Sequence, residues 1–351
     1  MTTEKNQKTR IMIVEDSMPV QVILNKVFSR IPNVEIVATV GSAEKAAKMV
    51  DQLRPNLISL DMKLEGGTGL DFLKLSNFRE YSRSTGARCI LVTDYSLHDR
   101  NFVFEAISLG ATSYIRKPQG SDLARFTTEI TDIITAFFRK ADPSLRAVEP
   151  VIEASHSIDL NAYNLIAVGS STGGTEIVRD IIGGLPRNCP PIVVAQHMPE
   201  QYTSVFASRI QAQTQRPTIE VKGPVQLHNN HAYIAAGSLD MIIEIRGPNL
   251  FATTRTDSKE TRFKPSVAAL FDSIQKIGLS NKSVAIMLTG MGHDGAQEML
   301  KLKQGGALTI GQSKESCVVY GMPRAAAELG ALFWSASPDK IIANLSHGTK
   351  K

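Results

Sequence analysis

The stretch Asn164–Thr175, NLIAVGSSTGGT, contains a strand, a tight turn and the start of a helix. Leu165–Val168 is a continuous apolar run, the residues after it are small, and a helix is expected from about Gly174. The turn Gly169–Gly173 satisfies the pattern G-x-S-x-G, in which a serine stands on a sharp strand-to-helix turn with its hydroxyl exposed. Small neighbours suit such a crowded turn, and free N–H groups at the helix start would stabilise an oxyanion. The stretch therefore predicts a nucleophilic Ser171.

Two other interpretations of this turn need no catalysis by serine. It is a plain Gly/Ser turn if nothing downstream supplies catalytic partners, because short motifs often occur by chance. A dinucleotide or phosphate loop fits poorly, since G-x-G-x-x-G would require glycine at Ser171 and no G-x-x-x-x-G-K-[ST] is present. The choice depends on whether a base and an orienting acid follow.

Two later strand ends supply the base and the acid that a serine nucleophile needs. His197 follows the apolar run Ile192–Ala195, and Asp294 follows Val284–Leu288. The functional groups of parallel sheets gather at the carboxyl ends of the strands. We therefore expect Ser171, His197 and Asp294 to meet at one edge if the three strands are neighbours.

Each of these partners has an alternative interpretation. Asp294 could be only the N-cap of a helix that begins at Gly295. His197 could be a structural residue that caps a helix. Three other histidines are rival bases, of which the first two flank a turn and follow no strand: His228, His231 and His293.

Strands and helices alternate through the second half of the chain, which predicts a doubly wound, Rossmann-like parallel sheet. Paired strands around Ala232–Thr253 predict an antiparallel hairpin attached to it. The expected strands are Leu165–Val168, Ile192–Ala195, Ala232–Ala236, Met241–Ile245, Val284–Leu288 and Leu308–Ile310. The expected helices are Glu176–Ile182, Tyr202–Gln211, Val267–Ile277, Gly295–Lys303 and Arg324–Leu329.

The first half alternates strand and helix five times, so it predicts a second α/β domain with a doubly wound parallel sheet. Helices are expected at Ala43–Leu53 and at Asp99–Leu109, the latter closed by Gly110. The expected strands are Ile11–Val14, Val34–Val40, Asn56–Leu60, Arg88–Val92 and Ser113–Ile115.

Polar side chains follow four of these strands. Glu15, Asp16 and Asp61 would converge as three carboxylates, and Thr93 and Lys117 would border the same pocket. Like charges that lie so close need a cation, and hard oxygen ligands suit Mg²⁺. Any one of these acids alone is better explained as a helix N-cap. The five together predict a phosphoryl-accepting carboxylate beside Mg²⁺ and a lysine.

Length and composition bound the organisation of the chain. With 351 residues, 42% hydrophobic and 21% charged, the chain is long enough for two domains, each with its own core. We place them at residues 8–140 and 162–345. Residues 141–161, which contain prolines and serines and show little periodicity, are the expected linker.

Charge, cysteines and hydropathy exclude several classes of protein. A net charge of +5 without long Lys/Arg runs is too weak to predict nucleic-acid binding. The three cysteines are widely spaced beside apolar runs, which is typical of buried thiols in a reducing compartment. No apolar run reaches the roughly 20 residues of a membrane helix, and the N-terminus lacks a signal sequence. We therefore expect a cytoplasmic protein without membrane insertion.

The motifs of the first half resemble those of the response-regulator receiver domain, which is flavodoxin-like. They are VEDS (14–17), SLDM (59–62), LVTD (91–94) and RKP (116–118). The resemblance implies that Asp61 is the phosphoacceptor. The carboxylates of Glu15, Asp16 and Asp61 and the backbone carbonyl of Lys63 would hold Mg²⁺. Thr93 and Lys117 would bind the phosphoryl group, and Tyr114 would be the switch aromatic. The loop 63–69 departs from the pattern, with Glu65 at the usual proline place and Thr68 at the usual aspartate place.

The motifs of the second half resemble, in order, those of the chemotaxis protein-glutamate methylesterase (CheB) catalytic domain. They are VGSSTGGTE (168–176), AQHMPEQYT (195–203), HAYIAAG (231–237), KPSVAALF (264–271), LTGMGHDGA (288–296) and CVVYGMPRAA (317–326). The resemblance implies a Ser–His–Asp hydrolase formed by Ser171, His197 and Asp294, with the backbone N–H of Met291 as an oxyanion donor. His293 stands where many members of the family have asparagine.

The two resemblances together imply a phosphorylation-regulated methylesterase. It would hydrolyse glutamate methyl esters on methyl-accepting chemotaxis receptors, deamidate receptor glutamines, and take its phosphoryl group from a chemotaxis histidine kinase. Ester hydrolysis itself would need no cofactor. An adaptor with an inactive second domain is a competing class, but the set Ser171, His197 and Asp294 is complete. A receiver-regulated hydrolase of some other ester stays open, whereas no recognition helix supports a DNA-binding output.

Overall fold

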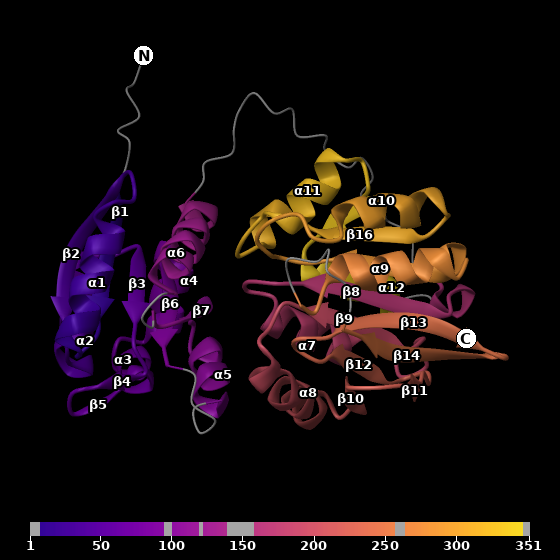
Figure 1. The fold of residues 1–351 in the computed structure, drawn as a ribbon, viewed down its shortest axis with the longest axis horizontal. Helices are drawn as coiled ribbons and strands as arrows, with labels where there is room; N and C mark the ends of the chain where they lie inside the picture. Colours follow the sequence, from indigo (N-terminus) through magenta and orange to yellow (C-terminus); the bar gives the residue numbers. More distant parts are fainter. Residues whose placement is uncertain (1–7, 95–99, 119–121, 139–157, 257–263, 347–351) are drawn as a thin grey trace, which may run out of the picture. The chain divides into compact units, whose positions relative to one another are not determined.

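The computed structural model describes residues 8–94, 100–118, 122–138, 158–256 and 264–346. The chain divides into two compact units, Met1–Lys140 and Ala141–Lys351 (Figure 1). Among the described residues, every helix is too short or too polar to cross a membrane.

The first unit is built on a five-stranded parallel sheet with the order β2-β1-β3-β6-β7. From β1 the chain moves outward to β2 and then crosses to β3 on the other side, which makes the gap between β1 and β3 the switch point. Ligands of such sheets bind at the carboxyl ends of the strands beside that point. The strands are β1 (Thr9–Val14), β2 (Val34–Val40), β3 (Leu57–Leu60), β6 (Arg88–Thr93) and β7 (Ser113–Arg116).

Helices cover this sheet, and a short hairpin follows β3. Helix α2 (Ala43–Leu53) buries a narrow stripe of small residues and ends at Arg54 in the left-handed conformation, directly before a proline. The predicted helix at Asp99–Leu109 is observed as α5 (Arg100–Ser108); Asp99 lies outside the described residues. The other elements are α1 (Met18–Phe28), β4 (Lys63–Leu64), β5 (Gly67–Thr68), α3 (Gly69–Leu75), α4 (Phe78–Thr85) and α6 (Leu123–Phe138).

The second unit contains a seven-stranded parallel sheet with the order β10-β12-β9-β8-β15-β16-β17. Strand β8 lies between β9 and β15, so the chain reverses direction across the sheet beside it. The strands are β8 (Leu165–Ser170), β9 (Ile192–Gln196), β10 (Thr218–Val221), β12 (Ala232–Ala235), β15 (Ser283–Met287), β16 (Leu308–Gln312) and β17 (Trp334–Ala336). Doubly wound parallel sheets in both units confirm the predicted fold class.

The predicted antiparallel hairpin is shorter at its start than expected. Residues Ala232–Ala235 form β12, which is buried throughout and belongs to the parallel sheet. The hairpin consists of β13 (Asp240–Arg246) and β14 (Asn249–Arg255), which pair antiparallel and join β11 (Val225–Gln226) in a separate three-stranded sheet. The reason is burial: β13 and β14 carry exposed residues, whereas β12 carries none.

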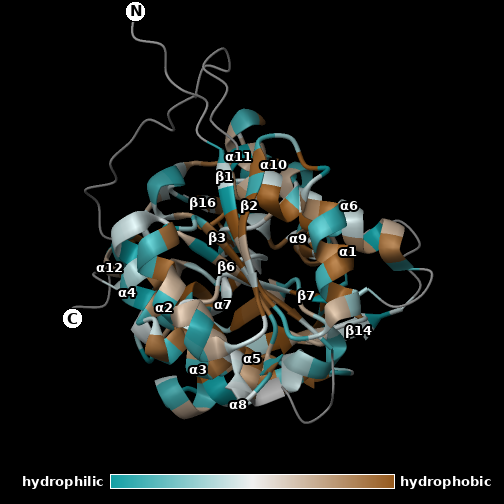
Figure 2. Ribbon diagram, turned by 90° about the vertical axis from the view of Figure 1, so that its left-hand side faces the viewer, coloured by the Kyte–Doolittle hydropathy of each residue, from teal (hydrophilic) through white to brown (hydrophobic). Residues whose placement is uncertain are grey.

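Two groups of helices sandwich the seven-stranded sheet. One group shares a buried core with alternate residues of β8, β9 and β15, and the β13–β14 hairpin packs on it. It consists of α9 (Val267–Lys276), α10 (Ala296–Gln304) and α11 (Met322–Glu328). The other consists of α7 (Thr175–Gly184), α8 (Glu200–Thr214) and α12 (Pro338–Ser346). Figure 2, which faces the first unit, shows brown apolar strands in the interior and teal polar residues on the helices.

Candidate active site and phosphorylation site

Ser171 stands on the turn that joins β8 to α7. All residues of β8 are buried, and Ser170 at its end is fully covered, whereas Ser171 is partly exposed. The Ser171 N–H donates to the carbonyl of Thr289 at 3.0 Å, and the Gly174 N–H donates to the Ser171 carbonyl at 3.0 Å. Gly173 adopts a positive φ of 78°, and a Cβ there would collide with Val318. The turn thus exposes one of the two adjacent serines.

His197 and Asp294 meet across the carboxyl edge of the same sheet. His197 follows β9 and Asp294 lies beyond β15, the two strands that flank β8. His197 Nε2 lies 2.8 Å from Asp294 Oδ2, and both side chains are nearly buried. The His197 N–H also donates to the Ser170 carbonyl at 2.9 Å, which ties the base to the strand of the nucleophile. The structure therefore brings the three predicted residues to one edge.

Asp294 occupies the N-terminus of α9, a helix distant from it in sequence. Its carboxylate accepts the N–H groups of Val267 at 2.7 Å and Ala268 at 3.2 Å, and the Ser266 hydroxyl at 3.1 Å. Burial alone would raise the pKa of Asp294, but the hydrogen bond and charge of His197 and the two amides hold it below its usual value. Asp294 is therefore an ionised partner of His197, and the helix that it caps is α9, whereas α10 begins after Gly295.

Two rival histidines lie at the opposite edge of the sheet. His231 directly precedes β12, and its carbonyl accepts the N–H of Ile192 at the start of β9. The rings of His228 and His231 lie 5.7 Å apart. His293 is exposed on the segment that leads into α10. Strand direction thus separates His228 and His231 from Ser171.

Two backbone N–H groups, one directly after Ser171 and one directly after Gly290, are candidate donors to an oxyanion. Within the described part of the chain, the N–H groups of Thr172 and Met291 donate no backbone hydrogen bond. Met291 follows Gly290, whose backbone is held by Val319, Gly321 and Met322. A Cβ on Gly290 would lie 2.7 Å from the Cβ of Ser171, so glycine permits the close approach of these two segments.

Three polar residues that sequence reasoning did not single out support this edge. The amide of Gln196 donates to the Ser171 carbonyl at 2.9 Å. Ser266 bonds Asp294 and caps α9 by accepting the Ala269 N–H at 3.2 Å. The Thr289 hydroxyl lies 3.0 Å from the Thr172 carbonyl. Each of these residues lies within one of the motifs or beside a strand end, and that position in the sequence could have indicated its role at the site.

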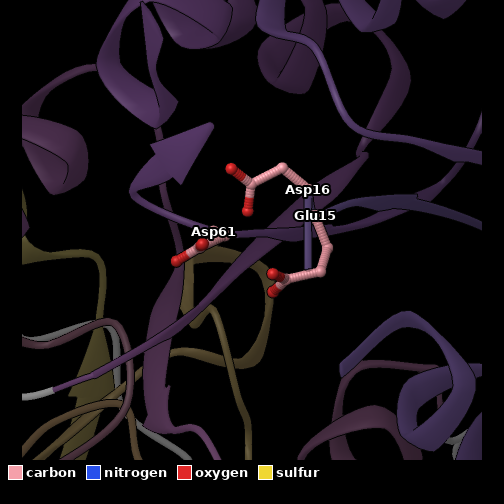
Figure 3. Close-up of side chains that lie close together, drawn as sticks. All are labelled: Glu15, Asp16 and Asp61. Atoms are coloured by element: carbon pink, nitrogen blue, oxygen red, sulfur yellow. The ribbon is translucent and has the colours of Figure 1, made fainter. Parts of the chain in front are cut away.

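The acidic residues of the first unit converge beside its switch point. Glu15 and Asp16 follow β1, Asp61 follows β3, and carboxylate oxygens of all three lie within 4.8 Å of one another (Figure 3). Glu15 and Asp61 are buried, whereas Asp16 is exposed. Lys117, which follows β7, places Nζ 2.7 Å from Asp61 Oδ2 and 2.9 Å from the Glu15 carboxylate.

Burial decides the direction of the pKa shifts of the two buried carboxylates in this cluster. It raises the pKa of Glu15 to about 6, against the opposing effect of Lys117. It also raises the pKa of Asp61. The pKa of Lys117 is raised because its bonds to Asp61 and Glu15 outweigh its own burial. Glu15 Oε2 lies 2.9 Å from Lys117 Nζ, and the carboxylate oxygens of Glu15, Asp16 and Asp61 form a set of hard ligands of the kind that Mg²⁺ prefers.

Thr93 and Tyr114 occupy β6, which pairs with β3, and β7, the next strand along the sheet. Thr93 ends β6 and is buried, and Tyr114 lies in β7 paired with Leu91. The atypical loop 63–69 forms the β4–β5 hairpin, in which Lys63 pairs with Thr68. Thr68 then caps α3 in a reciprocal capping box with Asp71. A local helix cap therefore explains the threonine in this loop.

These features define the class of protein: a flavodoxin-like unit with an acidic cluster, joined to a doubly wound α/β unit that brings a serine, a histidine and an aspartate to one sheet edge. The family model of the CheB methylesterase matches residues 166–345, and that of the response regulator receiver domain matches residues 11–131. The chain belongs to the CheB methylesterase family, which confirms the resemblance seen in the motifs.

Similar proteins match along almost the whole chain. A protein-glutamate methylesterase/protein-glutamine glutaminase 2 of Vibrio vulnificus (strain YJ016) is 33% identical over 93% of this chain and 94% of its own. A protein-glutamate methylesterase/protein-glutamine glutaminase 1 of Dechloromonas aromatica (strain RCB) is 34% identical over 95% and 96%. The crystal structure of the Thermotoga maritima CheB methylesterase catalytic domain covers 52% of this chain and 97% of its own, with a TM-score of 0.50 and 32% identity. The chain is therefore a hydrolase of this family.

Proposed function

We propose that this protein is a phosphorylation-regulated protein-glutamate methylesterase acting in the cytoplasm. Its substrates are glutamate methyl esters on methyl-accepting chemotaxis receptors, and it deamidates receptor glutamines by the same route. The observation that carries the proposal is the contact of 2.8 Å between His197 and Asp294, which lie beyond the carboxyl ends of the two strands that flank the Ser171 strand. The names of the relatives support the choice of ester.

In the proposed reaction, Ser171 Oγ attacks the ester carbonyl while His197 removes its proton. Because Asp294 engages Nε2, the proton goes to Nδ1 of His197. Asp294 holds the ring and stabilises its charged form, and the N–H groups of Thr172 and Met291 bind the oxyanion. One such donor is worth roughly 3 kcal/mol. Thr172 fits this role because the residue after the nucleophile supplies a donor in strand–turn–helix hydrolases.

The second half of the reaction restores the enzyme. His197 returns the proton to the leaving oxygen, methanol departs, and the acyl group remains on Ser171. Water attacks this acyl-enzyme with His197 again as the base, which releases a glutamate carboxylate. With glutamine the leaving group is ammonia and the acyl-enzyme is the same. The nucleophile, base and oxyanion donors of this route all come from the chain.

Asp61 is the proposed phosphoacceptor, and a chemotaxis histidine kinase is the proposed donor. Glu15, Asp16 and Asp61, with the Lys63 carbonyl, would hold Mg²⁺, which neutralises charge on the transferred phosphoryl group. Lys117 supplies a second positive charge at 2.7 Å from the acceptor carboxylate. Thr93 would bind the phosphoryl group, and Tyr114 would respond to it. Phosphorylation of Asp61 raises the esterase activity of the second unit.

The test is methanol release from membranes that carry methylated receptors, with and without a small-molecule phosphodonor. We expect release to rise with the phosphodonor. Ser171→Ala should lose about 10⁶-fold in rate, as triad nucleophiles do, whereas the matched variant Ser170→Ala keeps its activity within a few fold. Full activity of Ser171→Ala would overturn the nucleophile, and equal release with and without the phosphodonor would overturn the regulation.

A further inference from the structure

Gln196 is the last residue of β9 and directly precedes His197. Its side chain is 2% exposed, so its amide lies beneath the edge that carries the site. Nε2 donates to the carbonyl of Ser171 at 2.9 Å and lies 3.2 Å from the carbonyl of His197. One side chain thus contacts the backbones of both the proposed nucleophile and the proposed base.

The oxygen of the Gln196 side-chain amide is buried where the described part of the chain offers it no hydrogen bond. Gln196 Oε1 is buried and has no hydrogen-bond partner among the described residues, and the same is true of the neighbouring Ser170 Oγ. Both atoms lie against Gly174, in the space that a Cβ there would enter. An unpaired buried polar atom destabilises the folded state. Rotating the amide by half a turn would be worse, because Oε1 would then face two carbonyl oxygens. The two donated bonds therefore determine its orientation.

The bond to the Ser171 carbonyl also orients the neighbouring N–H. The carbonyl of Ser171 and the N–H of Thr172 belong to one planar trans peptide group and point in opposite directions. Holding the carbonyl toward Gln196 therefore turns the Thr172 N–H to the other side, and a rotation of this plane would move it away. The Ser171 carbonyl also accepts the Gly174 N–H at 3.0 Å, and the preceding peptide group is held separately because the Ser171 N–H donates to the Thr289 carbonyl. Gln196 adds to this plane a restraint that comes from the neighbouring strand β9.

We propose that Gln196 is a positioning residue that aims the Thr172 N–H at the oxyanion. The inference rests on the proposed serine chemistry and adds to it a group that touches no substrate. A misplacement of about 1 Å in a catalytic group can cost about 100-fold in rate. A residue that acts in this way lowers kcat and leaves KM nearly unchanged.

The test uses full-length variants of Gln196 and two assays. Gln196→Met has the same length and removes both donated bonds, and Gln196→Glu places an acceptor oxygen where Nε2 lay. The control is Ser283→Ala at the opposite edge of the sheet, which removes a buried hydrogen bond to the Leu279 carbonyl. Methanol release gives kcat and KM. Phosphonylation of Ser171 by a fluorophosphonate reports the serine and its oxyanion donors without any receptor.

We expect Gln196→Met to lower kcat and the phosphonylation rate by about 10- to 100-fold, with KM within about two-fold, and Gln196→Glu to lower both further. Ser283→Ala should lose stability by thermal unfolding and keep both rates. Unchanged phosphonylation in folded Gln196→Met would overturn the inference, as would losses that follow the melting temperature alone. Wild-type phosphonylation without methanol release would instead locate the failure in the proposed ester substrate.

Discussion

Replacing Glu15 by glutamine should stabilise the first unit at neutral pH when Mg²⁺ is absent. The Glu15 side chain is 1% exposed, and burial raises its pKa from 4.5 to about 6 although Lys117 opposes the shift. Each pKa unit corresponds to about 1.36 kcal/mol, so the charged carboxylate weakens the folded state by about 2 kcal/mol. Glutamine has nearly the same shape and can still accept the Ser17 N–H that Glu15 Oε1 accepts at 3.0 Å.

The sign of the pH dependence follows from linkage. Between pH 4.5 and about 6 the folded state binds more protons at Glu15 than the unfolded state, so the free energy of unfolding falls as pH rises through this window. Above this pH window Glu15 is charged in both states, and the decrease in the free energy of unfolding is complete. The advantage of Glu15→Gln should therefore be about 2 kcal/mol at pH 7.5 and vanish below pH 4.5.

Denaturant unfolding of the full chain without Mg²⁺ is the assay, followed by circular dichroism. The only tryptophan, Trp334, lies in the second unit and serves as an internal reference whose transition should not move. Adding Mg²⁺ should stabilise the wild type more than Glu15→Gln, because a cation neutralises the buried charge. Asp16→Asn, at the exposed member of the cluster, is the matched control and should gain less. A Glu15→Gln chain no more stable than the wild type at pH 7.5 would refute the reasoning, because Lys117 would then outweigh burial.

Three further changes test the rest of the site. Asp294→Asn should lower kcat of methanol release by about 10⁴-fold, because an amide cannot accept all the donors that converge on this carboxylate; a loss below 10-fold would contradict the triad. Gly290→Ala should cost about 1–3 kcal/mol in chemical unfolding and most of the activity, because its methyl group would lie 2.7 Å from the Cβ of Ser171; an active, equally stable variant would contradict that packing. Asp61→Asn, or removal of Mg²⁺ with a chelator, should abolish stimulation by the phosphodonor and leave unstimulated methanol release intact; persistent stimulation would place the phosphoryl group elsewhere.

Local sequence patterns were sufficient to predict the three strands that position the site residues. The strands β8, β9 and β15 begin within one residue of their predicted starts, because each is a short apolar run bounded by small or polar residues. Their ends extend one or two residues further in β8 and β9, since backbone pairing continues after the apolar run stops. The family motifs lie at these strand ends, which is why the sequence alone placed Ser171, His197 and Asp294 at one expected edge.

The order of the strands was decided only by tertiary structure. Nothing local to Leu165–Ser170 states that β9 and β15 flank it, and the contact between His197 and Asp294 joins residues 97 positions apart. The same holds for the N-terminus of α9, which meets Asp294 and lowers its pKa together with His197. Sequence reasoning offered the cap of the following helix, because a local pattern sees only the adjacent residues.

Periodicity and motifs are properties of adjacent residues, so they were enough to predict two α/β domains, their family, and the residue types at each strand end. Which side chains those residues meet became visible only in the folded chain. It showed Ser170 buried beside a partly exposed Ser171, β12 as a member of the parallel sheet, and Gln196 beneath the turn. These outcomes depend on hydrogen bonds and burial between segments far apart in the chain, which no local pattern encodes.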